Sequence, residues 1–219
     1  MKIKGSGSYT DAVGKSRMIL GIGELSDAEK FRELKVSGNI SFDKISCDEV
    51  KISGKCEGGS IEAQDLKISG KCEGKSVSAK NFSASGKMEI DSIKVEQIVE
   101  LKGKPELGSV EADEIIIESR SGSVDEIKCR KLKIFNRVIE TDSAFVLKIF
   151  GEEISGFDKF SRVRIKNIDA EKVELENCEV DIVRCKDAFI GANCAIDKLF
   201  VAGECKVADD STVGETIRI

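Results

Sequence analysis

A sixteen-residue repeat constrains the fold of this chain more than any other feature of its sequence. The segments LKVSG, VKISG, LKISG and FSASG begin at residues 34, 50, 66 and 82, so each begins sixteen residues after the one before. A fixed period of this length indicates a solenoid, in which each repeat packs only on its neighbours. A β-meander would instead need a turn about every eight to twelve residues.

Apolar residues recur within the repeat at offsets of 0, 2, 5 and 7. The copies begin at Ile45, Ile61, Val77, Ile93, Val110, Ile127, Ile168, Val183 and Cys194. The copy at Ile93 continues with Val95, Ile98 and Glu100, and the last copy continues with Ile196, Leu199 and Val201. Residues two apart lie on one face of a strand, and the step of three turns a corner while both pairs keep facing inward. We therefore predict an all-β fold, a parallel β-helix (β-solenoid) with about 16–17 residues and three short strands per coil.

The regularity of the repeat divides the chain into four segments. We predict an N-terminal strand or cap over 1–33, regular coils over 34–135, irregular coils or a joint over 136–167, and C-terminal coils over 168–219. The motif SDAE at 26–29 allows one helical turn. The Phe-rich segment at 145–160 fits either two longer coils with an out-turned loop or a joint between two halves. At about sixteen residues per coil, residues 34–219 would make about eleven or twelve coils.

The cysteines and glycines occupy fixed positions in the repeat. Cys47, Cys129 and Cys185 stand where other copies have alanine, and Cys56 and Cys72 align with Met88. No CxxC motif occurs, so we predict small core side chains rather than metal or redox sites. Glycines also recur at one corner, where we predict a backbone conformation that is unfavourable for β-branched residues. These glycines are Gly38, Gly54, Gly70 and Gly86.

Composition excludes several classes of function. The chain has no histidine, which removes Ser-His-Asp and Cys-His nucleophile pairs and all histidine metal sites. A formal net charge of -5 argues against nucleic acid as a partner. No apolar run approaches the roughly 20 residues of a membrane helix, and the first residues do not resemble a signal peptide. We expect a cytoplasmic protein with no cofactor and no small-molecule substrate.

Two repeats resemble a known family. Residues 50–63 and 66–79 contain ISGKCEGGSIEA and ISGKCEGKSVSA, and with the opening MKIKGSGS they resemble the bactofilins, the polymer-forming cytoskeletal proteins. The residues at the glycine and lysine sites of that family are Gly54, Lys55, Gly58, Gly70, Lys71 and Gly74. The resemblance implies a right-handed β-helix that polymerises without nucleotide, often at the inner face of the membrane and with membrane-associated partners.

The ends of a solenoid indicate how such a rod would associate. Each end exposes unpaired backbone groups and the last apolar layer, and stacking of copies end to end would cover both. We predict a polymer interface at Ile3, Val213, Ile217 and Ile219, with Ile217 and Ile219 facing inward in the last coil. The expected partner is another copy of the chain, in a homo-polymer or homo-oligomer, and the expected role is structural rather than enzymatic.

Two other classes of function stay open. A carbohydrate-active enzyme on a β-helix would use paired carboxylates on the outer wall, for which Glu89 with Asp91 or Asp209 with Asp210 are candidates. A cytoplasmic binding or adaptor module would instead dock a protein on a face with few charges.

Overall fold

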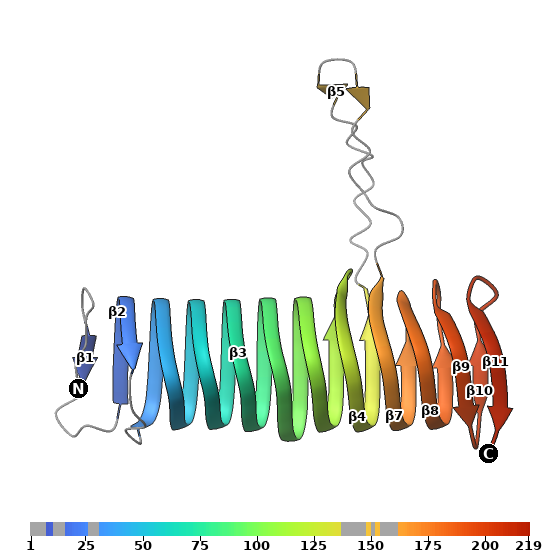
Figure 1. Ribbon diagram of the computed structural model, residues 1–219, viewed down its shortest axis with the longest axis horizontal. Helices are drawn as coiled ribbons and strands as arrows, with labels where there is room; N and C mark the ends of the chain where they lie inside the picture. The colour runs from blue at the N-terminus through green and yellow to red at the C-terminus, as the bar shows by residue number, and fades with distance from the viewer. Residues whose placement is uncertain (1–7, 11–15, 26–30, 137–147, 150–151, 154–161) are drawn as a thin grey trace.

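In the computed structural model the chain winds into a β-solenoid of about 10 turns (Figure 1). The structure describes residues 8–10, 16–25, 31–136, 148–149, 152–153 and 162–219. Its strands are β1 (Ser8–Thr10), β2 (Ser16–Leu25), β3 (Phe31–Glu118), β4 (Gly122–Phe135), β5 (Lys148–Ile149), β6 (Glu152–Glu153), β7 (Val163–Leu175), β8 (Cys178–Ile190), β9 (Ala195–Val201), β10 (Cys205–Val207) and β11 (Thr212–Arg218).

Successive coils pair in parallel, which confirms the predicted fold class. The strands from β2 to β11 pair in parallel along the rod, in the order β2, β3, β4, β7, β8, β9 and β11, with β10 on β8. The strand β3 runs through the corners of its coils without a break for 88 residues. Two pairs are antiparallel, β1 with β2 and β5 with β6.

Six columns of inward side chains fill the tube. The pattern at offsets 0, 2, 5 and 7 supplies four columns, and the column of Cys56, Cys72 and Met88 is a fifth. The sixth contains Phe42, Ile90, Leu107, Val124, Ile165 and Val180, all buried. Gly58 follows Phe42 in this column, and a Cβ on Gly58 would collide with the carbonyl oxygen of Phe42 and lie 2.8 Å from Cδ2 of its ring. A glycine is therefore needed here because both the backbone and the ring of Phe42 occupy the space of a side chain.

The structure corrects the phase of two copies of the pattern. In the fourth copy Val99 and Leu101 are buried, whereas the predicted Ile98 and Glu100 are only half-buried. This coil has seventeen residues, and its extra residue lies at the corner before Val99. In the last copy Leu199 pairs with Val183, so that copy begins at Leu199 rather than at Cys194.

The boundaries of the coil region also differ from the prediction. Strand β2 pairs in register with β3, from Ser16 with Glu33 to Leu25 with Phe42, so coils begin at residue 16 rather than 34. Strand β4 pairs directly with β7, from Gly122 with Val163 to Ile134 with Leu175. The rod therefore continues across the irregular segment without a joint, and C-terminal coils begin at 163. Since β4 pairs directly with β7, the rod has about 10 turns instead of the predicted eleven or twelve. The suggested helical turn at 26–29 lies outside the described residues.

One corner of the tube is a stack of glycines, as predicted. Gly54 and Gly70 have φ of 129° and 128°, in the region that favours glycine. A Cβ on Gly70 would meet the carbonyl oxygen of Gly54 well inside the 3.0 Å that real Cβ atoms keep. In the C-terminal coils asparagine occupies left-handed positions: Asn177 and Asn193 have φ of 55° and 56°, and Nδ2 of Asn193 donates to Oδ1 of Asn177 over 2.6 Å. This asparagine pair was not predicted.

Candidate functional site

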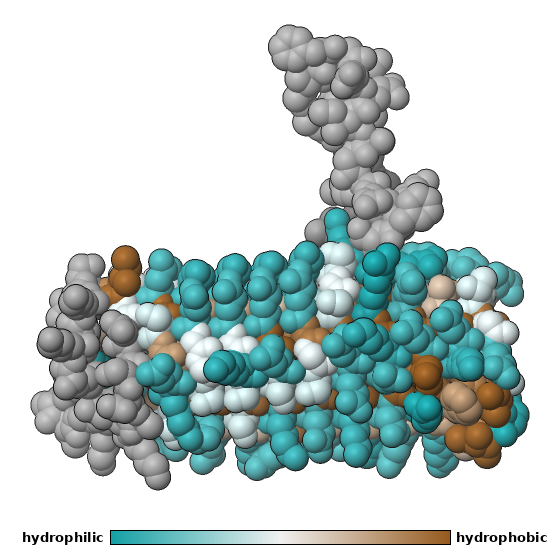
Figure 2. Space-filling view, in the orientation of Figure 1, coloured by the Kyte–Doolittle hydropathy of each residue, from teal (hydrophilic) through white to brown (hydrophobic). Residues whose placement is uncertain are grey.

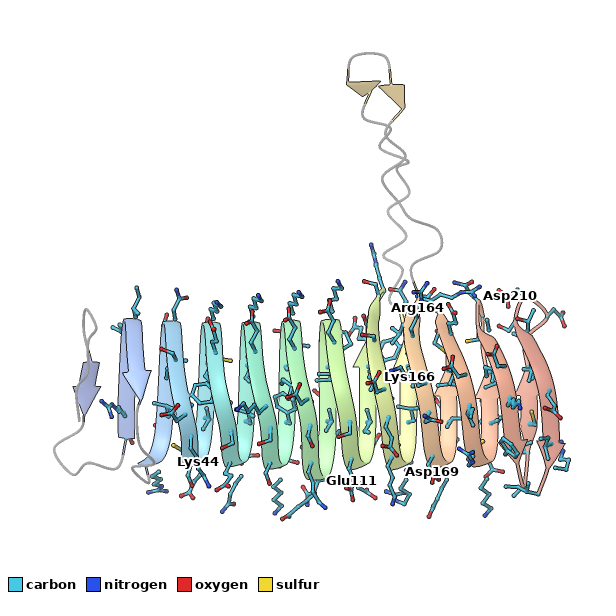
Figure 3. The ribbon with its side chains drawn as sticks, viewed as in Figure 1. Lys44, Glu111, Arg164, Lys166, Asp169 and Asp210 are labelled. Atoms are coloured by element: carbon cyan, nitrogen blue, oxygen red, sulfur yellow. The ribbon has the colours of Figure 1, made fainter. Side chains whose placement is uncertain are left out.

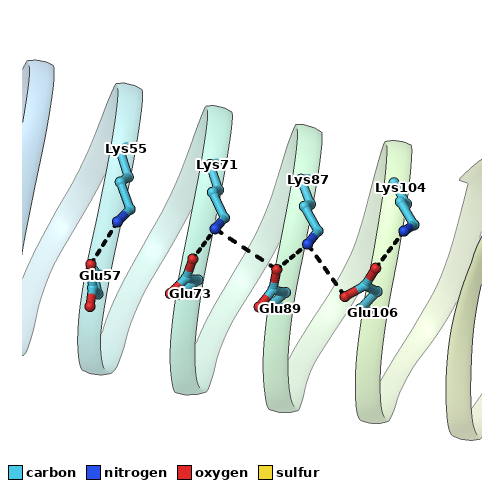
Figure 4. A network of polar contacts seen from close by, with 8 residues as sticks. All are labelled: Lys55, Glu57, Lys71, Glu73, Lys87, Glu89, Lys104 and Glu106. Carbon is cyan, nitrogen blue, oxygen red and sulfur yellow. Dashed lines mark hydrogen bonds and ion pairs between the residues drawn. The ribbon is translucent and has the colours of Figure 1, made fainter.

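A ladder of lysine and glutamate side chains covers one wall of the middle coils (Figure 4). Each lysine pairs with the glutamate two residues ahead: Lys55 with Glu57, Lys71 with Glu73, Lys87 with Glu89, and Lys104 with Glu106. Contacts between coils join these pairs, with Lys71 Nζ 4.0 Å from Glu89 and Lys87 Nζ 3.6 Å from Glu106. The charges of this wall are thus balanced by their neighbours, which does not favour a polyanion site.

The ladder predicts a component of acid sensitivity. Hydrogen bonds from Lys55 and Lys104 hold the pKa of Glu57 and Glu106 below their ordinary values. A carboxyl group whose pKa is lower in the folded than in the unfolded chain stabilises the fold at pH values above its unfolded pKa of about 4.3. This stabilisation is lost as the pH falls through the folded-state pKa. We expect Glu57→Gln/Glu106→Gln to lose less Tm than the wild type between about pH 5 and pH 3. Equal losses in calorimetry would show that these pairs contribute nothing.

A groove with a volume of about 850 Å³ lies along one outer face of the rod. Its floor contains Ala63, Ala79 and Ala112. Four of its charged lining residues form ion pairs: Lys94 with Glu111 at 3.4 Å, Glu62 with Lys44 at 2.6 Å, and Asp113 with Arg130 through two hydrogen bonds of 2.7 Å. Lys44 and Glu111 project away from the tube (Figure 3). No aromatic residue lines the groove, so its lining offers no stacking platform for a sugar ring.

The structure does not enclose either candidate carboxylate pair. Glu89 forms ion pairs with Lys87 and Lys71 on the outer wall. Asp209 and Asp210 are exposed at a turn, and Asp210 lies at the C-terminal end of the rod (Figure 3). Acid–base catalysis on a sugar needs two carboxyl groups held on either side of the bond that breaks. Both candidate pairs lie on the outer surface of the rod and not in an enclosed site.

The cysteines lie in the core, as predicted. Cys47, Cys56, Cys72, Cys178, Cys185 and Cys194 are buried, and Cys129 and Cys205 are half-buried. Burial raises the pKa of Cys129 and of Cys185 to about 12, which keeps both thiols protonated and unreactive at neutral pH. The sulfur atoms of Cys178 and Cys194 lie 3.5 Å apart, and this contact together with burial raises the pKa of Cys178. Among the described residues no group of three acidic or thiol side chains is placed to hold a metal.

Exposed large apolar side chains occur only on the terminal coils of the described chain. Met18, Leu20 and Ile22 lie on β2, Val207 on β10, and Ile219 follows β11. The longer body of the rod between them has mostly charged and small polar residues outside, and outward apolar side chains there, such as Ile116, are half-buried. Figure 2 shows apolar side chains gathered at the C-terminal end, in the region of β9 and β11. The apolar surface of this rod is therefore concentrated at its two ends.

The predicted interface residues have different positions at the C-terminal end. Val213 pairs with Ile196, faces inward and packs against the core. Ile217 pairs with Phe200, whose neighbours Leu199 and Val201 are buried, so Ile217 faces outward and not inward. Arg218 pairs with the buried Val201, so alternation along the strand places the next residue, Ile219, outward as well, where it is 69% exposed. Ile3 lies outside the described residues.

The inward layers at the two ends are covered to different extents. At the N-terminal end Arg17 and Ile19 occupy inward positions, opposite Leu34 and Val36, and both are buried. At the C-terminal end Val207 continues the inward column of Ile190 yet is 41% exposed. Open core surface is thus found at the C-terminal end, and sequence reasoning did not distinguish the two ends.

Comparisons of the chain with family models, with curated proteins and with solved structures found no match. The part of the chain that the structure describes contains no helix of the length and apolarity that crossing a membrane requires.

Proposed function

We propose that this protein is a non-enzymatic structural scaffold, a rod that associates end to end with copies of itself without nucleotide. The observation that supports this proposal most is the position of the exposed large apolar side chains, all of which lie on terminal coils of the described chain. Apolar surface of this kind on a soluble protein is typical of an interaction site.

The walls of the rod favour association at the ends over association at the sides. Charged side chains on strand surfaces oppose sideways sheet contacts, and here they are already engaged in ion pairs along the rod. The C-terminal end offers both open apolar core surface and, in the described chain, a strand edge without a partner. The resemblance of residues 50–63 and 66–79 to the bactofilins points to the same kind of function, a cytoskeletal scaffold near a membrane.

The proposal is tested by adding charge to the C-terminal end. We expect Ile217→Asp/Ile219→Asp to abolish association, because two carboxylates would be desolvated at the junction. The matched control is Ile116→Asp, which changes an outward isoleucine of a middle coil opposite Lys133. Sedimentation velocity over a range of concentrations measures association, and circular dichroism confirms that each variant keeps its β signal. If the end variant associates like the wild type, the C-terminal end is not the junction.

A further inference from the structure

The two ends of the rod differ in a way that determines how copies can join. At the N-terminal end β1 lies antiparallel on the outer edge of β2, with Tyr9 opposite Met18 and Thr10 opposite Arg17. The adjoining inward position holds Arg17, a charged side chain that is only 3% exposed. A strand already on the edge and an inward charge both oppose the addition of another coil.

The C-terminal end has neither feature. In the described chain β11 pairs on one side with β9, and no strand covers its other edge. The inward column is open there at Val207. Outward, Phe200 and Ile217 are in register and form a short apolar stripe that ends at this edge. A partner for this edge must itself offer an unpaired strand with apolar outward residues, and β11 of a second copy has both.

We propose that two copies join through their C-terminal ends by antiparallel pairing of β11 with the β11 of the partner, centred on Ile217. This inference rests on the proposed function and specifies its geometry. A two-fold axis makes the contact self-complementary, so that it closes after two chains. Because the N-terminal end does not add a coil, the full chain forms a paired rod rather than a growing filament.

The alternation of side chains restricts the register of this pairing. In an antiparallel pair, opposite residues project to the same face, so inward Thr216 and Arg218 must oppose inward residues of the partner. The pairing must therefore centre on a residue and not between two. Centring on Thr216 would put Ile217 opposite the partner's Glu215. Centring on Ile217 joins it to the partner's Ile217 and extends the stripe from Phe200 to the partner's Phe200.

A symmetric cross-link tests this register. Ile217→Cys should form a covalent dimer under mild oxidation with copper phenanthroline, because the two introduced thiols replace side chains that face each other. Two controls accompany this variant. Lys94→Cys places a thiol at an exposed position of a middle coil and reports cross-links from other contacts, and the wild type reports cross-links from the native thiols. If the Ile217→Cys variant gives no more covalent dimer than these controls, in a sample that sedimentation shows to be associated, the C-terminal pairing is overturned.

The limit of two chains is tested by a variant that removes the two features that oppose addition of a coil at the N-terminal end. The mass of the wild type should reach a plateau at two chains as concentration rises. In Tyr9→Pro/Arg17→Leu, proline disturbs β1 and leucine replaces the inward charge, so the mass should continue to rise beyond two chains. The control Tyr9→Thr/Arg17→Lys keeps a strand-forming residue and the charge and should remain at two.

The outcomes separate this inference from the proposed function. A wild type that stays a single chain at every concentration would contradict the proposed function itself. A wild type that grows past two chains would leave self-association intact but overturn closure at the N-terminal end. If the Tyr9→Pro/Arg17→Leu variant folds and its mass stops at two chains, the role given to β1 and Arg17 is overturned. If that variant does not fold, the inference is decided by the wild-type mass plateau at two chains and by the Ile217→Cys cross-link.

Discussion

Gly70→Ala is expected to be among the most destabilising single substitutions in this protein. The φ of 128° at Gly70 costs an alanine about 1–3 kcal/mol from the backbone conformation alone. The added Cβ would also collide with the carbonyl oxygen of Gly54, a backbone atom that cannot move without shifting the neighbouring coil. The free energy of unfolding should therefore fall by more than the conformational cost.

Gly74→Ala is the matched control, four residues further along the same coil. A Cβ on Gly74 would have its nearest neighbours at 3.7 Å and 3.9 Å, in ordinary contact, and Gly74 has no positive φ. Its effect should stay within about 0.5 kcal/mol. Thermal unfolding followed by circular dichroism compares the two variants. Equal Tm values for both would contradict the stacked corner.

Cys72→Asp is expected to disrupt the coils around it. Cys72 is 1% exposed and lies in the inward column beside Cys56, which is also buried. A carboxyl group there loses its hydration without an ionic partner, which costs several kcal/mol, by rough estimate, whether it is buried charged or protonated. The β signal should weaken and Tm should fall sharply.

Ser78→Asp adds the same charge in the following coil at an exposed position. This control should unfold close to the wild-type temperature, because its carboxylate remains in water. Cys72→Ala separates the loss of the thiol from the gain of charge and should cost less than Cys72→Asp. If Cys72→Asp unfolds at the temperature of Ser78→Asp, the thiol does not face the interior of the tube.

The sequence predicted the tube well where its spacing is unambiguous. In most coils two pairs of apolar residues, each pair two positions apart, are separated by one corner step of three. Only one face of each strand could then point into the tube. The phase was wrong in the coil that begins at Ile93, because Ile98 and Val99 are adjacent apolar residues and either could continue the pattern. It was wrong again at Cys194 and Ile196, which are also two apart but lie on the third side of a coil.

The candidate site was harder to predict because the hydrophobic pattern changes in the last coil. Its inward positions include Thr216 and Arg218, which face an open end, whereas Ile217 and Ile219 face outward. Apolarity therefore no longer marks the inward side there. The difference between the two ends also depends on the antiparallel pairing of β1, which is a three-residue contact without a periodic signal. The inward Arg17 is the one sequence feature that marks that end.

Small-angle X-ray scattering over a range of protein concentrations tests end-to-end association most directly. A single rod of about 10 turns is about 50 Å long, at about 4.8 Å per coil. We predict that the maximum dimension increases with concentration while the cross-sectional radius of gyration stays constant. A cross-section that thickens, or a length that does not change at any concentration, would contradict a scaffold that joins through its ends.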